Sequence, residues 1–220
     1  MGNGIAHVLA LAGIDVTLID ESAEVLEAAR AKIEKNLSRQ IAKNRLEAAE
    51  ARAALDRIAT ATDLSAAAAA GIVVEAVPEN RYLKLAIFSR LGNACAETAV
   101  LASNTSSISI TEIAAAVRNP GRFIGMHFMN PVPMMKLVEV IRGLATDDET
   151  TGAVMELSTE LGKTPVEVND FPGFVSNRVL MPMINEAVFA LMEGVAEPEA
   201  IDTVMKLGMN HPMGPLALAD

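Results

Sequence analysis

Short apolar runs alternate with helical segments along much of this chain, and that alternation constrains its fold more than any other feature. "GIVVEAV" at 71–77 and "AVLASN" at 99–104 are apolar on both faces, and the segment 81–97 between them has a helical pattern. Strands without a polar face are typical of parallel sheets that helices cover on both sides. The sequence therefore predicts a doubly wound α/β domain.

The opening 62 residues follow the same order. The pattern predicts a helix over 4–12, a strand over 16–19, a long helix from Ser22 to at least Asn44, and a strand over 58–62. Ser22 is a suitable N-cap for the long helix. We interpret the alanine run at 66–70 as ordinary helix.

The pattern changes after Pro120. "RFIGMHFMNPVPMMKLVEVIRG" predicts two strands around a proline-rich turn, with no helix between them, and a helix over 147–161 and the strand "TPVEV" follow. From Pro172 onward the periodicity is helical. We expect a dinucleotide-binding domain over 1–170 and the start of an all-helical domain over 171–220. We also expect the chain to be truncated at both ends, so that it lacks the sheet's first strand and folds poorly alone.

Composition excludes several classes of function. A net charge of −10 and an isoelectric point near 4.8 argue against a nucleic-acid partner. Cys95 is the single cysteine, which excludes a disulfide framework and a thiolate metal cluster, and we expect no metal site and a reducing, cytoplasmic location. No Lys or Arg precedes Arg30, so the apolar start is not a signal peptide, and no apolar run is long enough for a membrane helix.

The opening "MGNGIAHVLALAGIDVTLID" is typical of the second half of a dinucleotide-binding βαβ unit. Gly2 or Gly4 could be the last fingerprint glycine, at a helix N-terminus that faces the pyrophosphate. Asp20 ends the next strand, where a carboxylate binds the ribose hydroxyls and disfavours a 2′-phosphate, which favours NAD over NADP. Acidic residues also end strands for no such reason, so from this stretch alone both interpretations stay open.

His127 and Glu139 are the best candidates for acid–base chemistry. Oxidation of a secondary alcohol needs a base that titrates near neutrality, and histidine meets that need. The two residues lie in the two strands after Pro120, each six positions from Pro133. A hairpin centred there places them directly opposite each other, close enough for the carboxylate to orient the imidazole. The alternative is an ordinary core histidine.

Three stretches carry a resemblance to a known family: "LASNTSSISITEIA", "GMHFMNPVPMMKLVEVIRG" and "NDFPGFVSNRVLMPMINEA". Over essentially all 220 residues the chain resembles the L-3-hydroxyacyl-CoA dehydrogenases, and most closely the bacterial 3-hydroxybutyryl-CoA dehydrogenases. The resemblance implies a Rossmann-type NAD domain followed by a helical substrate and dimerisation domain. It implies NAD-dependent interconversion of (S)-3-hydroxyacyl-CoA and 3-oxoacyl-CoA, as in fatty-acid β-oxidation or butanoate metabolism, by a homodimer.

The resemblance also implies roles for single residues. It assigns His127 as the base, Glu139 as its orienting partner, and Ser106 and Asn177 as contacts to the substrate; Ser106 or Ser107 could instead cap the helix that begins near Ser109. Further residues implied to contact a ligand are Glu79, Lys84 and Asn130 for the cofactor, beside Gly2 and Asp20, and Lys43 for the CoA phosphate. A solvated helix lysine is an equal alternative for Lys43, and Asn36 replaces a serine of the related CoA site.

The remaining reactive residues have plainer interpretations. His7 is expected to pack on the opening helix, His211 lies in a turn, and Cys95 is expected in the core on a helix. Met134 and Met135 could line an acyl pocket.

The sequence argues against one rival function and leaves two others open. A 6-phosphogluconate-type dehydrogenase needs an N-x-x-K lysine, which is absent after "FVSNR". A non-catalytic structural or NAD-binding member of the same fold and an inactive fragment stay open as alternatives.

Overall fold

The computed structural model describes residues 1–220, which form two compact units, Met1–Phe171 and Pro172–Asp220. None of its helices combines the length and the apolar character that a membrane crossing requires.

Unit 1 contains a five-stranded sheet, and its strand order follows the sequence. The strands are β3 (Ile72–Glu75), β4 (Val100–Ser103), β5 (Phe123–Phe128), β6 (Leu137–Arg142) and β7 (Thr164–Asn169). Only β5 and β6 pair antiparallel, because they are joined by a turn without a crossover helix; the other neighbours are parallel. The expected α/β architecture is confirmed, including the antiparallel pair after Pro120.

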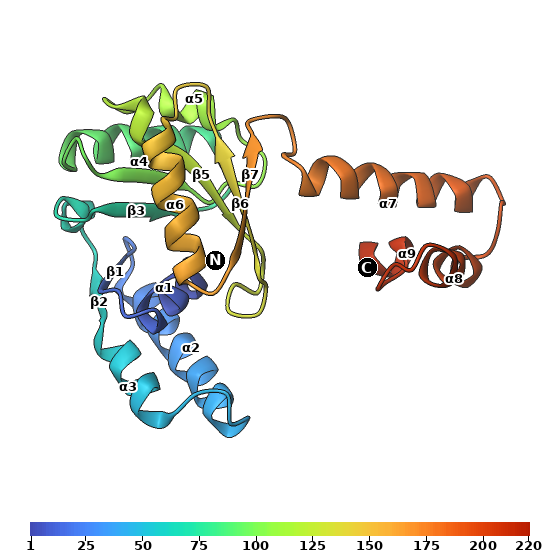
Figure 1. Ribbon diagram of the computed structural model, residues 1–220, viewed down its shortest axis with the longest axis horizontal. Coiled ribbons are helices and arrows are strands. Elements are labelled where there is room, and N and C mark those ends of the chain that lie inside the picture. Colours follow the sequence, from blue (N-terminus) through green and yellow to red (C-terminus); the bar gives the residue numbers. More distant parts are fainter. The chain divides into compact units, whose positions relative to one another are not determined.

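A separate two-stranded parallel sheet joins β1 (Val16–Ile19) and β2 (Ile58–Ala61). The helices α1 (Gly2–Leu11), α2 (Ala23–Ala42) and α3 (Ala48–Asp56) pack around it (Figure 1). Their shared core consists of Ala6, Ala10, Ile33, Leu37, Ala51, Ala54 and Ile58. Small alanines on α1 and α3 allow the close approach of these helices.

The five-stranded sheet has two different faces. α6 (Asp148–Glu160) crosses the front of this sheet in Figure 1, and its Val154 packs with Ile124 and Met126 of β5. The odd-numbered residues of β5 point to the opposite face, where the Phe123 ring meets that of Phe88 edge-on at 4.7 Å between ring centres. Phe88 belongs to α4 (Arg81–Ala94). His127 shares this second face by strand alternation.

Gly125 allows α5 (Ile110–Ala114) to approach β5 closely. A Cβ at position 125 would lie 2.7 Å from Cβ of Ile141 and 2.9 Å from two side-chain carbons of Ile110. The first helical turn after the "SNTSS" segment is therefore held against the strand that carries His127.

Side chains that accept hydrogen bonds fix where the helices begin. Ser22 Oγ accepts from the Val25 amide at 3.3 Å, as expected, and Asn80 and Asp147 cap α4 and α6 in the same way. The long second helix ends at Ala42, before Asn44, which has a left-handed φ of 54°. Beyond it lies α3, a separate helix that the sequence analysis did not predict.

Two expectations about local structure are wrong. The alanine run is mostly not helical: a single 3₁₀ turn, η1, covers Leu64–Ala67 before the chain turns into β3. Cys95 follows the last residue of α4 in extended conformation and is not on the helix. It is buried, its Sγ lies 3.5 Å from the Ala67 carbonyl oxygen, and burial raises the pKa of the thiol. A second 3₁₀ turn, η2, covers Pro120–Arg122.

Unit 2 consists of α7 (Ser176–Met192), α8 (Pro198–Gly208) and α9 (Pro215–Ala219). The Asp202 carboxylate on α8 accepts hydrogen bonds from the Leu216 and Ala217 amides, both at 2.9 Å. A Cβ at position 214 would lie 2.1 Å from the Asp202 carboxylate carbon, so only glycine fits between α8 and α9 at this point.

Candidate active site

The hairpin of β5 and β6 places His127 directly opposite Glu139, which confirms the predicted register. Nδ1 of His127 lies 2.8 Å from Oε2 of Glu139, and the two residues are 6% and 2% exposed. A carboxylate can only accept, so Nδ1 carries the proton of this bond. The neutral imidazole then has its lone pair on Nε2, which is the atom that a base uses.

Ser106 lies on the other side of the imidazole ring. Its Oγ is 3.1 Å from Nε2 of His127, and the side chain is half-buried. Glu139, His127 and Ser106 therefore form one continuous row of hydrogen-bonding groups. The sequence separation of Ser106 from His127 is bridged by the parallel pairing of β4 with β5, because Ser106 follows β4 at its carboxyl end.

Glu79 holds the segment 104–109, which we call the Ser106 loop. Its Oε1 accepts from the amides of Ser106 and Ser107 at 2.9 and 3.1 Å and from the hydroxyls of Thr105 and Ser107 at 2.5 and 3.1 Å. Burial is the largest single influence on the Glu79 carboxyl and would raise its pKa. The hydrogen bonds and the nearby Lys84 charge outweigh burial and lower the pKa, so Glu79 is a carboxylate.

Two further side chains, which the sequence analysis did not single out, hold the same loop. Asn104 Oδ1 accepts from the Phe128 amide at 2.8 Å, which ties the loop to the residue after His127. The Asp170 carboxylate accepts from Ser109 Oγ at 2.7 Å and from the Ile110 and Thr111 amides at 3.1 and 2.8 Å. Their only sequence signal is their position, because both directly follow a strand of the sheet.

Ser109 is the N-cap of α5. Its Oγ accepts from the Glu112 amide at 3.2 Å, whereas Ser106 Oγ contacts His127 and Ser107 Oγ contacts Glu79. The alternative in which Ser106 or Ser107 caps that helix is therefore wrong.

Lys84 is buried, with 1% of its surface exposed. Its Nζ lies 2.7 Å from Oε1 of Glu75 and 3.4 Å from Oε2 of Glu79, so one ammonium joins two carboxylates. Glu75 was also missed by the sequence analysis. The signal that could have revealed it is a lone charge within the apolar run "GIVVEAV", because buried charges are normally paired.

The start of α1 lies at the carboxyl ends of parallel strands, where such sheets bind ligands. A Cβ on Gly2 would lie 3.9 Å from Leu18 of β1 and 3.9 Å from Ala76, which follows β3. Asp20, exposed at the end of β1, accepts from the Ser22 amide through Oδ1 at 3.0 Å and leaves Oδ2 for a ligand. Of the two candidate glycines, Gly4 is the one required by packing, since its Cβ would lie 2.9 Å from Val132.

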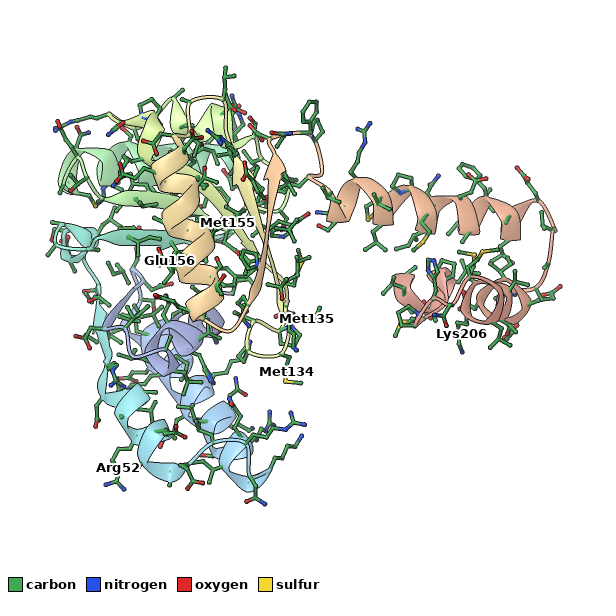
Figure 2. The ribbon with its side chains drawn as sticks, in the orientation of Figure 1. Arg52, Met134, Met135, Met155, Glu156 and Lys206 are labelled. Carbon is green, nitrogen blue, oxygen red and sulfur yellow. The ribbon has the colours of Figure 1, made fainter.

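Lys43 lies at the opposite end of α2 from Asp20. Twenty helical residues separate them, which corresponds to about 30 Å. Gln40, one turn before Lys43, lines a cavity of about 380 Å³ together with Met134 and Met135. Figure 2 labels these two methionines, which lie in the turn between β5 and β6. Lys43 is exposed.

Four other residues that the sequence analysis named lie elsewhere in the fold. Asn130 is exposed, two residues after β5, and Asn177 lies in the first turn of α7 in unit 2. His7 is buried in α1, with Nε2 at 3.1 Å from Nε2 of Gln40 and no hydrogen-bond partner at Nδ1. His211 lies in the loop between α8 and α9 in unit 2.

Comparison with known proteins identifies the family. Residues 1–171 match the 3-hydroxyacyl-CoA dehydrogenase NAD-binding domain, and residues 173–220 match the C-terminal domain of the same family. The whole chain is 57% identical to a probable 3-hydroxybutyryl-CoA dehydrogenase of Bacillus subtilis, of which it covers 77%. It is 53% identical to a 3-hydroxybutyryl-CoA dehydrogenase of Bradyrhizobium diazoefficiens, of which it covers 75%.

Solved structures agree with this result. The crystal structure of (S)-3-hydroxybutyryl-CoA dehydrogenase from Ralstonia eutropha superposes with a TM-score of 0.97 at 51% identity, over the whole chain and 77% of that protein. The chain belongs to the 3-hydroxyacyl-CoA dehydrogenase family.

Proposed function

We propose that this protein interconverts (S)-3-hydroxyacyl-CoA and 3-oxoacyl-CoA with NAD and acts on short acyl chains such as 3-hydroxybutyryl. The observation that carries the proposal is the row formed by Glu139, His127 and Ser106, in which a carboxylate orients the imidazole. Such a reaction belongs to fatty-acid β-oxidation or to butanoate metabolism.

His127 is the proposed base. Nε2 takes the proton of the substrate hydroxyl during oxidation and returns it during reduction. Glu139 keeps the ring in the tautomer that has its lone pair on Nε2, and the charge of Glu139 stabilises the imidazolium that forms. Since Glu139 is almost fully buried, this charge is poorly screened by water.

Ser106 and Asn177 are the proposed contacts to the reacting oxygen. A hydroxyl and an amide that donate to this oxygen stabilise the charge that develops on it. Ser106 is already 3.1 Å from the ring nitrogen that would exchange the proton.

The cofactor site is proposed at the carboxyl ends of β1 and β3. Gly2 at the start of α1 would face the pyrophosphate with amides that have no partner within the helix, and Asp20 would accept from the ribose hydroxyls. Glu79, Lys84 and Asn130 are proposed to border the nicotinamide. Bound NAD supplies the hydride acceptor.

Asp20 is expected to exclude NADP, because its carboxylate repels a 2′-phosphate. We expect Asp20→Ala to lower the preference for NADH over NADPH, measured as the ratio of kcat/KM values, by about tenfold or more. Asp15→Ala, at the other end of the same strand, is the matched control. An unchanged preference in the Asp20 variant would contradict this role.

The CoA moiety is proposed to extend toward the end of α2. Lys43 would contact the phosphate groups of CoA. The cavity beside Met134 and Met135 offers an apolar surface to the remainder of the CoA moiety. The distance of about 30 Å between Asp20 and Lys43 supports separate binding regions for cofactor and CoA.

A homodimer through unit 2 is also proposed. The large apolar side chains that α7 and α8 expose are Val179, Met181, Val188, Phe189, Leu191, Met192, Val204 and Leu207. Exposed apolar surface of this kind marks association sites. Light scattering on the purified protein tests it, and a monomeric mass at micromolar concentration would contradict it.

The first experiment is an absorbance assay at the NADH band with acetoacetyl-CoA. We expect NADH consumption, and we expect His127→Gln to lower kcat by about 10²- to 10⁴-fold. His211→Gln makes the same exchange in the loop between α8 and α9 and should leave kcat unchanged. If NAD binds but no turnover occurs, the non-catalytic alternative is correct.

A further inference from the structure

Glu75 is a buried carboxylate in the sheet that the reaction itself does not use. Its Oε1 accepts from the Val77 amide and from Lys84 Nζ, both at 2.7 Å, and its Oε2 accepts from Ser103 Oγ at 2.7 Å. The residue is 5% exposed. Both oxygens of the carboxylate therefore accept hydrogen bonds from groups of the protein itself.

Glu75 shares its cation with Glu79. Lys84 Nζ is 2.7 Å from Glu75 and 3.4 Å from Glu79, and it also lies 3.5 Å from the Val77 carbonyl oxygen. The two carboxylates compete for a single ammonium that water does not reach. Glu75 holds the shorter bond.

The two oxygens of Glu79 have different partners. Oε1 receives four hydrogen bonds from the Ser106 loop, and Oε2 faces Lys84. A movement of Oε2 toward the ammonium would rotate or shift the carboxylate and weaken its bonds to the loop. The position of Ser106 therefore depends on how strongly Lys84 attracts Glu79.

We propose that Glu75 is a positioning residue for catalysis: by holding Lys84, it leaves Glu79 free to fix the Ser106 loop against His127. The proposal rests on the proposed roles of Ser106 and His127. In this arrangement Glu75 acts through Lys84 and Glu79 on the Ser106 hydroxyl, which lies next to the base His127.

Loss of the Glu75 charge should have a defined consequence. Lys84, at 1% exposure, would then have Glu79 as its one remaining carboxylate, and the attraction between the two would increase. Glu79 would move toward Lys84, and Ser106 would lose its fixed position relative to Nε2. Displacements of about 1 Å at reacting groups lower rates by up to about 100-fold.

Glu75→Gln is the test variant, because it keeps the shape and an acceptor for Val77 while it removes the charge. Ser103→Ala is the matched control, since it removes a hydrogen bond to the other oxygen of Glu75 without touching Lys84. Ser106→Ala and the double variant Glu75→Gln/Ser106→Ala complete a double-mutant cycle. Circular dichroism thermal unfolding checks that each variant folds.

The first readout is the ¹⁵N NMR spectrum of histidine-labelled protein, which does not depend on turnover. We expect Glu75→Gln to shift the His127 Nε2 resonance toward its position in Ser106→Ala, with no further shift in the double variant. His7 and His211 lie outside this network and serve as internal references. An unchanged His127 resonance in Glu75→Gln would overturn the proposal.

The second readout is NADH consumption with acetoacetyl-CoA. We expect Glu75→Gln to lower kcat about tenfold in the wild-type background and less than twofold in the Ser106→Ala background, with a change in KM for NADH of less than threefold. Ser103→Ala should change kcat less than twofold. An equal loss of kcat in both backgrounds would mean that Glu75 has only a structural role.

The test also covers a Glu75 variant that does not fold and a wild-type protein that shows no turnover. If Glu75→Gln fails to fold because Lys84 is left buried, Glu75→Gln/Lys84→Met removes both charges. Without the ammonium nothing attracts Glu79 away from the Ser106 loop, so the His127 resonance should stay at its wild-type position. A shift toward its position in Ser106→Ala would then overturn the proposal. If the wild-type protein consumes no NADH, the proposed function fails, and the His127 resonance still decides whether Glu75 positions Ser106.

Discussion

At the scale of single residues, the two buried histidines differ in their partners. His127 has a carboxylate at Nδ1 and a hydroxyl at Nε2, whereas His7 has one amide neighbour and a buried Nδ1 without a partner. A histidine becomes a base through its partners, because burial alone disfavours the charged form. The contrast explains why His127, and not His7, is the candidate base.

His7 is expected to make stability depend on pH. Burial, and then the charge of Lys163, lower the pKa of His7 below its usual value of about 6.5. The unfolded chain therefore binds a proton that the folded protein excludes, so stability falls as the pH drops below about 6.5.

Urea unfolding of wild type and His7→Gln at several pH values measures this effect. We expect the variant to lose less stability than wild type between pH 7 and pH 5, because glutamine does not titrate. His211→Gln is the control and should follow wild type. Parallel curves for wild type and His7→Gln would contradict the prediction.

At the scale of elements, glycines decide how closely helices approach the sheet. Gly4 on α1 has Val132 at 2.9 Å from the position of a Cβ, whereas Gly152 on α6 has no heavy atom within 4 Å. We expect Gly4→Ala to lower the free energy of unfolding by about 1–3 kcal/mol through overpacking. Gly152→Ala should raise it by about 0.5–1 kcal/mol through helix propensity. Thermal unfolding measures both, and equal signs for the two changes would contradict the packing argument.

Asp170 connects the end of β7 to the start of α5. Its burial, the largest influence, would raise the carboxyl pKa, but the hydrogen bonds from Thr111, Ser109 and Ile110 together lower it. A lowered pKa stabilises the folded protein above the usual carboxyl value of about 3.9, and this stabilisation is lost as the pH falls further. The contribution is therefore complete at neutral pH.

Asp170→Asn should accordingly be less stable than wild type at pH 7, by about 1–2 kcal/mol, and the difference should shrink toward pH 3. Urea unfolding at both pH values measures the two differences. Asp15→Asn exchanges an exposed aspartate and should change stability by less than about 0.5 kcal/mol. A difference that stays constant down to pH 3 would contradict the charge argument.

At the scale of the whole molecule, unit 1 contains two sheets of unequal size. β1 and β2 pair only with each other, whereas β4 and β5 each have a strand on both sides. An isolated two-stranded pair has few shared hydrogen bonds and opens more easily. We expect amide hydrogens of residues 16–19 to exchange faster than those of 100–103 and 123–128. Hydrogen exchange by mass spectrometry measures this, and equal protection would show that the two sheets open as one cooperative unit.

Much of the fold follows from local pattern. The order of strands and helices, the antiparallel pair and the cap at Ser22 were predicted because each depends on nearby residues. The register of His127 with Glu139 could be predicted because a tight hairpin fixes pairing by distance from its turn. The break at Asn44, the helix α3 and the short 3₁₀ turn in the alanine run could not, because a strong helical composition does not indicate where tertiary packing ends a helix.

The sequence by itself determined the α/β class, the family resemblance and the histidine–glutamate pair, since these depend on periodicity, motifs and one local turn. Only the tertiary structure showed what holds Ser106 in place. The segment 75–84, the Ser106 loop and Asp170 come from distant parts of the chain, and their contacts exist because parallel strands bring their carboxyl ends to one edge of the sheet. A buried charge is stabilised by groups that lie close to it in space, and spacing along the chain does not reveal those groups.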